Sequence, residues 1–260
     1  MRKLLFVLAT FVLFGFCSCS KDAGDPITKD FEISGTYTKL DVSSGFVVTV
    51  SDSATQVSVT TGENVMPKVV VEIVNQTLRV YLKPVNVSGA YELQLTLPYN
   101  ADLKSVNLSG ASSFQSSHPL TGQKVDVELS GASSFFCDLN SNLVDIDLSG
   151  ASSIEGNVSA TELDLDMSGA SEASLVGTAI SLRTEISGAS HIINKMVEER
   201  FSLACRNCTG EISGASTVYI HCDESITVEL SGGSDLYYTG HADTSGSTTS
   251  GGSRIIRIIP

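Results

Sequence analysis

The chain has 260 residues, of which 42% are hydrophobic and 17% are charged, and its formal net charge is −13. A surface this acidic repels phosphate backbones, so nucleic acid is excluded as a partner. The sequence contains no Trp, which removes the largest aromatic platform for a sugar ring.

The N-terminus has the pattern of a secretion signal. A short basic region precedes an apolar stretch over residues 4–16, which is too short to span a bilayer. Residues 1–18 resemble the signal peptide of bacterial lipoproteins. This resemblance implies that Cys19 carries a lipid, that residues 19–30 form a lipidated tether, and that the tether ends in a membrane. The alternative is a cleaved signal peptide without a lipid.

A lipid at this position would place the protein at the cell envelope. We expect an outer membrane lipoprotein that faces either the cell surface or the periplasm. The sequence does not distinguish the leaflet, and it gives no indication of the oligomeric state.

Residues 31–100 are predicted to form an irregular β-rich half. Runs rich in β-branched and aromatic residues alternate with polar segments, as expected for strands. The predicted strands cover residues 46–50, 56–60, 69–73, 78–82 and 91–97. Asn75 and Gln76, which lie between two of these runs, predict a hairpin turn.

The remainder of the chain repeats one short phrase, Ser-Gly-Ala-Ser or Ser-Gly-Gly-Ser. Its copies begin at Ser109, Ser130, Ser149, Ser168, Ser187, Ser213, Ser231 and Ser250. The spacings are 21, 19, 19, 19, 26, 18 and 19 residues. Such a period, with glycine turns, is typical of stacked units that bury their apolar faces against their neighbours. The repeat therefore predicts a β-solenoid over residues 101–260.

Each rung is predicted to have two short strands joined at a corner formed by the phrase. The residues before a copy alternate between apolar and acidic, as in residues 144–148, which indicates a half-buried strand. The glycine is expected to turn the chain at positive φ and to let the next rung approach closely. The stacked serines are expected to form hydroxyl ladders along the corner.

Two departures from the regular rung are expected. The 26-residue interval has seven residues more than the common 19, which predicts a loop or a single helical turn around residues 193–200. The segment 239–253 has the Gly/Ser/Thr composition of a flexible linker. However, it contains the last copy of the phrase at the regular distance of 19 residues, so we expect it to be the terminal rung.

An acidic residue stands two positions before the phrase in six consecutive rungs. These residues are Glu128, Asp147, Asp166, Glu185, Glu211 and Glu229. In stacked rungs the carboxylates would lie about 5 Å apart and repel by roughly 1 kcal/mol in water. Two interpretations are open. Ca²⁺ ions could bridge neighbouring carboxylates, or the side chains could form a solvated face whose charge deters aggregation.

The position four residues after each opening serine varies from rung to rung. Variation on a regular scaffold is a candidate for recognition. Glu172, His191 and Asp235 form this recognition column, with a glycan or a protein as the expected ligand. The alternative is an ordinary polar outer face.

Four cysteines remain in the expected mature chain, at Cys137, Cys205, Cys208 and Cys222. In an oxidising compartment they predict either buried thiols or a disulfide, with Cys205, Cys208 and Cys222 as its possible members. A Cys-x-x-Cys spacing can also belong to a redox or zinc site. The sequence lacks both the strand-to-helix setting of a thioredoxin motif and a second ligand pair.

Catalysis is not expected. Basic residues are few, the four histidines are scattered without an obvious partner, and no Gly-x-Ser-x-Gly elbow occurs. Because β-helices also host enzymes that act on polysaccharides, a carbohydrate-active enzyme is kept as the least favoured alternative.

The order of these features carries a family resemblance. A lipoprotein-like leader, a β-rich half that ends in Leu97-Pro98, and repeated Ser-Gly-Ala-Ser phrases from Leu108 onward resemble the putative auto-transporter adhesin, head GIN domain family, a group of Bacteroidetes-type envelope lipoproteins. The resemblance covers nearly all of residues 31–260. It implies a right-handed parallel β-helix-like fold and an adhesive role at the envelope, and it implies no catalytic residue.

We therefore expect an all-β chain, with a right-handed parallel β-helix-like solenoid preceded by a β-rich N-terminal half that packs in continuity with it. Residues 31–260 would form this one domain. The expected function is that of a non-catalytic cell-envelope lipoprotein, which acts as an adhesin or binding scaffold for surface glycans or proteins. The alternative is a structural envelope component without a dedicated ligand.

Overall fold

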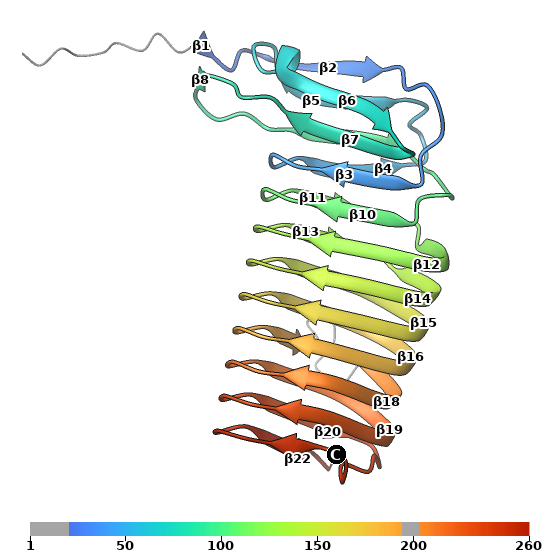
Figure 1. Cartoon of the computed structure of the whole chain (residues 1–260). Coiled ribbons are helices and arrows are strands. Elements are labelled where there is room, and N and C mark those ends of the chain that lie inside the picture. The colour runs from blue at the N-terminus through green and yellow to red at the C-terminus, as the bar shows by residue number, and fades with distance from the viewer. Residues whose placement is uncertain (1–20, 194–202, 260) are drawn as a thin grey trace, which may run out of the picture.

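The structure is a computed structural model that describes residues 21–193 and 203–259. The regular elements of these residues are strands and one short 3₁₀ turn, η1 (Met66–Lys68). The strands stack along one axis as a β-solenoid of about eight turns of about 19 residues. A cap of differently arranged strands closes the N-terminal end of the rod (Figure 1). The predicted all-β solenoid is confirmed.

The strands of the solenoid pair with the strands of the rungs above and below them. They are β10 (Ser105–Leu108), β11 (Ser113–Gln115), β12 (Leu120–Leu129), β13 (Ser134–Phe136), β14 (Leu139–Leu148), β15 (Ser153–Met167), β16 (Glu172–Ile186), β17 (His191–Ile193), β18 (Leu203–Ile212), β19 (Thr217–Leu230), β20 (Asp235–Thr239), β21 (Thr248–Thr249) and β22 (Arg254–Arg257). The pairings among these strands are parallel. Equivalent positions of successive rungs therefore lie side by side.

Inward-facing positions stack into apolar ladders that form a continuous core. Ile146 is fully buried and pairs in register with Val127 on one side and Leu165 on the other. Phe114 and Phe135 stack with ring centroids 5.2 Å apart and planes inclined by 12°. Burial of each such side chain stabilises the fold by roughly 1.5–3 kcal/mol. The alternation of these residues with exposed acids explains the two-residue period of the sequence.

The corners of consecutive rungs stack directly on one another. Gly169 has a φ of 76°, and the amide of Ala170 donates to the carbonyl oxygen of Gly150 at 2.7 Å. A Cβ on Gly169 would lie 2.3 Å from that oxygen. The corner therefore needs glycine both for its backbone conformation and for the close approach of the neighbouring rung. Positive φ recurs at the glycines of the phrase, Gly110, Gly131, Gly150, Gly169, Gly188, Gly214, Gly232 and Gly251.

The serine hydroxyls at the corner donate hydrogen bonds to backbone carbonyl oxygens and do not form the predicted hydroxyl ladders. The second serine of the phrase is buried in every copy but the last, and its hydroxyl donates to the carbonyl of the first serine, as from Ser171 to Ser168 at 2.8 Å. The same bond is made by Ser112, Ser133, Ser152, Ser190, Ser216, Ser234 and Ser253. The first serine of several copies donates instead to a carbonyl of the preceding rung, as from Ser149 to Leu129 at 3.4 Å. The prediction of hydroxyl-to-hydroxyl ladders is wrong, because both serines find carbonyl acceptors.

The first turn of the solenoid lies inside the N-terminal half. β3 (Lys39–Val42) and β4 (Val47–Ser51) pair in parallel with β10 and β11. Between them, Ser44 and Gly45 adopt φ values of 79° and 84°, and the amide of Gly45 donates to Ser112 Oγ at 3.2 Å. This corner lacks the repeated phrase, so the sequence pattern does not reveal it.

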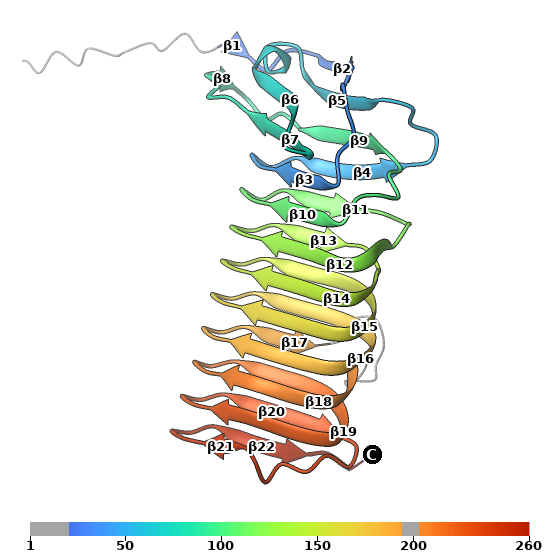
Figure 2. The same ribbon diagram turned by 45° about the vertical axis from the view of Figure 1, so that its right-hand side comes forward.

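The strands that follow return above this first turn and close the rod (Figure 2). They are β5 (Val57–Gly62), β6 (Val69–Val74), β7 (Thr77–Leu82), β8 (Val87–Ser88) and β9 (Gln94–Pro98). β7 and β9 pair in parallel with β3 and β4, so the order of stacking differs from the order along the chain. β6 and β7 form an antiparallel hairpin whose turn residues, Asn75 and Gln76, have positive φ, which confirms the predicted turn.

Part of the predicted tether belongs to the cap. β1 (Lys21–Asp22) pairs in parallel with β8, and β2 (Pro26–Phe31) pairs in antiparallel fashion with β5. The predicted tether over residues 19–30 is therefore too long. Five of the six residues of β2 are exposed, and an edge strand of this kind has no hydrophobic alternation by which the sequence could identify it.

The end of the rod agrees with the sequence. Residues 239–253 contribute β21 and the corner at Gly251, and β22 then pairs with β20, so the predicted terminal rung is confirmed. The predicted signal peptide over residues 1–18, the lipid acceptor Cys19 and most of the loop predicted around residues 193–200 lie outside the described residues.

We predict that Gly169→Ala lowers the free energy of unfolding by more than about 2 kcal/mol, because alanine is strained at positive φ and its methyl group would overlap the neighbouring carbonyl. Gly233→Ala is the matched control. Gly233 stands where other phrases have alanine, and the nearest atom to an added Cβ is 3.8 Å away. Chemical denaturation followed by circular dichroism should show little change for the control, and equal losses for both variants would contradict this account.

Candidate functional site

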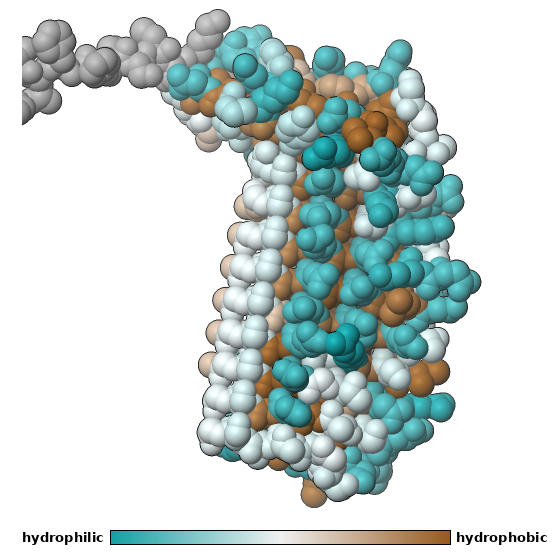
Figure 3. Space-filling model, viewed as in Figure 1, coloured by the Kyte–Doolittle hydropathy of each residue, from teal (hydrophilic) through white to brown (hydrophobic). Residues whose placement is uncertain are grey.

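The six acids predicted to form a column are neighbours in the structure. Each is exposed and is the register partner of the next across adjacent parallel strands, in the order Glu128, Asp147, Asp166, Glu185, Glu211 and Glu229. In Figure 3, hydrophilic side chains run in columns down the rod beside the pale stripe of the corners. We call this set the acidic column.

Neighbouring carboxylates oppose one another's ionisation. Partial burial, together with the charges of Asp145 and Asp166, raises the pKa of Asp147. Partial burial and the charge of Glu185 raise the pKa of Asp166. Because the pKa of these groups is higher in the folded chain than in the unfolded chain, their ionisation at neutral pH works against folding.

A lysine offsets part of this repulsion in a second acidic row, two residues before the column. Lys124 Nζ lies 2.6 Å from Asp126 Oδ1 and 3.1 Å from Asp145 Oδ2. Hydrogen bonds to these two carboxylates raise the pKa of Lys124 to about 12. Since the carboxylates belong to adjacent rungs, the lysine joins the two rungs through their outer faces.

Two further side chains act on the acidic column itself. Arg183 forms an ion pair with Glu185, and Asn107 Nδ2 donates to Glu128 Oε2 at 2.7 Å. A shallow basin of about 280 Å³ lies over the middle of this face. It is lined by Asp145, Asp147, Asp164, Leu165, Asp166, Arg183 and Glu185.

Calcium bridging along the acidic column stays a prediction. Within residues 21–193 and 203–259, no group of three or more His, Cys, Asp or Glu side chains is arranged to hold a metal ion. The carboxylates form rows along a flat sheet and do not converge on a centre, whereas Ca²⁺ prefers six to eight surrounding oxygens. The exposed rows of acids, with Lys124 and Arg183 paired to some of them, fit a solvated face.

The recognition column is also continuous. His191 pairs in register with Glu172 and with Thr217, and Thr217 pairs with Asp235. Glu172, His191 and Asp235 are half-buried. The structure therefore brings the three predicted residues onto one face, with Asp235 two rungs beyond His191.

Ionic and aromatic contacts order the C-terminal end of this column. Arg254 Nε and Nη2 donate to the two carboxylate oxygens of Asp235 at 2.9 and 2.6 Å, and the Tyr237 hydroxyl donates to Asp235 at 3.2 Å. The hydrogen bond from Arg254 is the main cause of the lowered pKa of Asp235. Beside the column, Tyr219 and Tyr237 stack with ring centroids 4.8 Å apart.

The four cysteines, Cys137, Cys205, Cys208 and Cys222, are buried and occur as thiols. Burial raises the pKa of Cys208 to about 12, and a hydrogen bond with Cys222 together with burial raises the pKa of Cys205. Cys205 and Cys208 therefore stay protonated at neutral pH and are poor nucleophiles, whereas the hydrogen bond with Cys205 lowers the pKa of Cys222. Cys205 and Cys222 are register partners on β18 and β19, which makes them the adjacent pair within the predicted disulfide set. That disulfide stays a prediction.

Three histidines lie close to acidic side chains, and His241 Nδ1 is 4.0 Å from Asp223 Oδ1. His118 Nε2 lies 2.6 Å from Asp52 Oδ1. His221 contacts Asp223 at 3.2 Å through Nε2 and the Thr239 hydroxyl at 2.9 Å through Nδ1. The expectation that the histidines lack partners is wrong for His118 and His221. Asp52 comes from a segment distant from His118 along the chain, whereas Asp223 lies two residues after His221 on β19. Thr239 is only 8% exposed, so its hydroxyl is poorly placed to attack a substrate.

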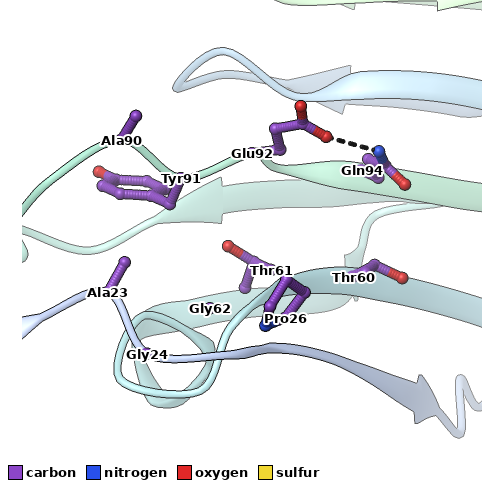
Figure 4. Close-up of a pocket in the computed structure, with 10 residues that line it drawn as sticks. All are labelled: Ala23, Gly24, Pro26, Thr60, Thr61, Gly62, Ala90, Tyr91, Glu92 and Gln94. Atoms are coloured by element: carbon purple, nitrogen blue, oxygen red, sulfur yellow. Dashed lines mark hydrogen bonds between the residues drawn. The ribbon is translucent and has the colours of Figure 1, made fainter.

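A pocket of about 360 Å³ lies in the cap, between the β2–β5 pair and the segment that leads into β9 (Figure 4). We call it the N-terminal pocket. It is lined by Ala23, Gly24, Pro26, Thr60, Thr61, Gly62, Ala90, Tyr91, Glu92 and Gln94. No sequence motif predicts it, because its wall comes from three segments that are distant along the chain.

One wall residue of the N-terminal pocket is unusual. Thr61 is 2% exposed, and its hydroxyl is fully buried without a hydrogen-bond partner. Among the described residues, no other buried side-chain oxygen or nitrogen lacks a hydrogen-bond partner. A buried hydroxyl without a partner costs roughly 1–3 kcal/mol, so its presence calls for an explanation.

The fold and these surfaces define an all-β rod with ordered columns of side chains on its faces and the N-terminal pocket in its cap. In the ranges 21–193 and 203–259, no helix is long and apolar enough to cross a membrane. The model of the family described as "Putative auto-transporter adhesin, head GIN domain" matches residues 36–242. The chain belongs to this family.

Solved structures support the same fold. A putative adhesin from Parabacteroides merdae is 19% identical, with a TM-score of 0.79 over 92% of this chain and 98% of that chain. A putative adhesin from Parabacteroides distasonis is 20% identical, with a TM-score of 0.71 over 92% and 97% of the two chains. A putative lipid binding protein from the same species is 19% identical, with a TM-score of 0.73 over 92% and 99%. No curated protein matches the chain.

We predict that Asp147→Asn combined with Asp166→Asn stabilises the protein at pH 7, by roughly 0.2–1 kcal/mol for each repulsive contact removed. Because the folded-state pKa values are raised, the wild-type chain should gain the same stability when the pH falls through the folded pKa towards the unfolded value. Thermal unfolding at several pH values measures both effects. A double variant less stable than wild type at pH 7 would contradict this prediction.

Calcium provides a second arm of that experiment. If Ca²⁺ bridges the acidic column, millimolar calcium should raise the melting temperature of the wild-type chain and leave the double variant unchanged. If the column is a solvated face, calcium and an equal ionic strength of sodium chloride should act alike, because both only screen the repulsion.

Proposed function

We propose that the protein is a non-catalytic cell-envelope lipoprotein that acts as an adhesin or binding scaffold for surface glycans or proteins. Membership of the head GIN family supports an adhesive role. The observation that carries the proposal is the recognition column, a row of different side chains held at the rung spacing along one face of a rigid rod. A flat, regularly spaced face suits an extended polymer or a protein surface better than a small substrate.

The chemistry of the column fits reversible recognition. Glu172, His191 and Asp235 offer carboxylate oxygens and an imidazole ring, and the Tyr219–Tyr237 stack adds aromatic area next to them. Side chains that are already ordered by packing lose little conformational freedom on binding. At one end of the recognition column, the two hydrogen bonds from Arg254 hold the Asp235 side chain in place.

The position of the N-terminus supports anchoring at the cap. The described chain begins at β1 in the cap and ends at β22, at the opposite end of the rod (Figure 1). With a lipid on Cys19, the cap would lie near the membrane and the terminal rung would point away from it. The faces of the solenoid would then stand exposed along the length of the rod.

We predict that the purified mature chain is retained on an array of glycans and matrix proteins. Retention should fall at least about tenfold in a triple variant, Glu172→Ala, His191→Ala and Asp235→Ala, because the recognition column would then lack its polar groups. Glu128→Gln with Glu229→Gln is the matched control, since it changes the acidic column and leaves the other face intact. Circular dichroism checks that both variants fold.

The outcomes separate the candidate functions. A triple variant that binds as well as wild type would exclude the recognition column. A wild-type chain that is retained by no coated surface, and that instead co-purifies with other envelope proteins, would favour a structural component without a dedicated ligand. Hydrolysis or elimination products from polysaccharides would contradict the non-catalytic assignment.

A second prediction concerns the anchor. Metabolic labelling with a tagged palmitate should label the wild-type protein and place it in the membrane fraction, whereas Cys19→Ala should remain unlabelled and soluble. Protease treatment of intact cells then reports the leaflet, because only a surface-exposed rod is digested. An unlabelled wild-type protein would contradict lipidation and favour the cleaved signal peptide.

A further inference from the structure

We propose that the N-terminal pocket binds a neutral saccharide unit, a mono- or disaccharide end of a larger glycan. The proposal rests on the proposed function, since it names a ligand class for a binding protein of the envelope. It concerns a site distinct from the recognition column, because the N-terminal pocket lies in the cap and the recognition column lies on the solenoid.

The orphaned hydroxyl of Thr61 is the first observation. Thr61 lies at the end of β5, in the wall of the N-terminal pocket, and Oγ1 has no partner in the described chain. In Figure 4 the oxygen points from the β5 side toward the segment that carries Tyr91. A group that stays unsatisfied in the unliganded fold is explained if a ligand hydroxyl supplies the missing bond.

The charge of the lining narrows the ligand class. The ten lining residues include no Lys, Arg or His, and one of them is the acidic Glu92. A phosphate, sulfate or carboxylate would therefore meet a negative charge with no cation to offset it. A hydrocarbon chain would strip water from the polar atoms of Thr60, Glu92 and Gln94 without replacing their hydrogen bonds. A neutral ligand with many hydroxyls avoids both costs.

The arrangement of the remaining groups suits a sugar ring. The Tyr91 ring and Ala90 lie on one side of the space, and Ala23 and Pro26 lie on the other (Figure 4). These apolar surfaces can contact the C–H face of a pyranose, as aromatic rings commonly do with ligands of mixed polarity. At the rim, Gln94 Nε2 donates to Glu92 Oε2 at 2.8 Å, and the free lone pairs and N–H of this pair can bond adjacent hydroxyls.

The size of the N-terminal pocket and its rigidity support a small preformed site. Its volume of about 360 Å³ lies near the lower end of the range for ligand pockets, roughly 300–1,000 Å³. The floor is fixed by backbone bonds, from Asn64 N to Ala23 O at 3.0 Å and from Glu63 N to Asp25 O at 2.9 Å. A Cβ on Gly62 would lie 2.2 Å from Ala23 O, so glycine is required for these two segments to meet.

The N-terminal pocket is also close to the predicted anchor. Ala23 follows Cys19 by four residues, a length of chain that reaches at most about 14 Å. A saccharide bound there could be the headgroup of a glycolipid in the same membrane or the end of a soluble glycan. Both sources present the same neutral hydroxyl-rich chemistry, and the experiment below separates them.

The test uses the full mature chain with glucose, galactose, mannose, N-acetylglucosamine and lactose as probes. Saturation-transfer NMR and calorimetry should detect at least one of them with a dissociation constant below about 10 mM. Glucose 6-phosphate should bind at least about tenfold more weakly than glucose, because of the acidic lining. In the second arm, a neutral glycolipid in phosphatidylcholine vesicles replaces the free sugar. Tighter binding to the vesicles than to the free sugar assigns the ligand to a membrane.

Two pairs of variants check the site. Thr61→Val should weaken binding at least about tenfold and raise the melting temperature of the unliganded chain, since it removes the orphaned hydroxyl. Thr96→Val, on β9 outside the pocket lining, should change neither affinity nor the ligand-induced shift. Tyr91→Ala should abolish binding, and Tyr91→Phe should retain it because the ring remains.

The results distinguish this proposal from the proposed function. If no neutral saccharide binds, or if Thr61→Val and Tyr91→Ala bind as well as wild type, the saccharide site is excluded. Adhesion through the recognition column would stand in that case, because the array experiment uses other residues. If the saccharide binds and the array experiment fails, the pocket would be the binding site and the recognition column would not.

Discussion

The contact between successive corners is the constraint on which the rest of the solenoid depends. At the six corners from Gly150 onward, the amide that follows the glycine donates to the glycine carbonyl of the preceding rung, as from Ala189 to Gly169 at 2.7 Å. The distance leaves no room for a Cβ, so the rungs can stack in one register only. Because the register is fixed at the corner, residues at equal distances from it line up. The acidic column, the recognition column and the core ladders are all products of that alignment.

The sequence predicts this part of the fold well because two independent patterns agree. The phrase fixes where each rung turns, and the alternation before it fixes which side chains face inward. The cap is harder, because the chain forms one turn at β3 and β4, leaves it, and returns above it before the regular rungs continue. Pairing between distant segments has no local signature. The corner at Ser44 and Gly45 was missed for a related reason, since a different pair of residues makes the same turn.

The same division holds for the surfaces. Glu128 and Asp147 could be assigned to one column from spacing alone, because each lies two positions before its phrase. The N-terminal pocket could not be predicted, since Ala23, Thr61 and Tyr91 come from three segments that meet only in the cap. The contact of His118 with Asp52 was missed likewise, because these residues are distant along the chain. Positions that recur in every rung leave a repeated pattern in the sequence, from which their place in the fold can be predicted. A contact that occurs once between distant segments leaves no such pattern.

The bond between each buried serine and the carbonyl three residues before it has a consequence for how such rods change in length. Because a regular rung carries this serine bond with it and offers its neighbour the same corner amide and glycine carbonyl, it needs only a neighbour of the same shape. Gain or loss of one complete repeat would alter the height of the rod by roughly 4.8 Å and keep every face in line. Gain of a single residue inside a strand would instead exchange interior and exterior positions up to the next corner. Related proteins are therefore expected to differ in length by whole repeats, with insertions of other lengths confined to the loops.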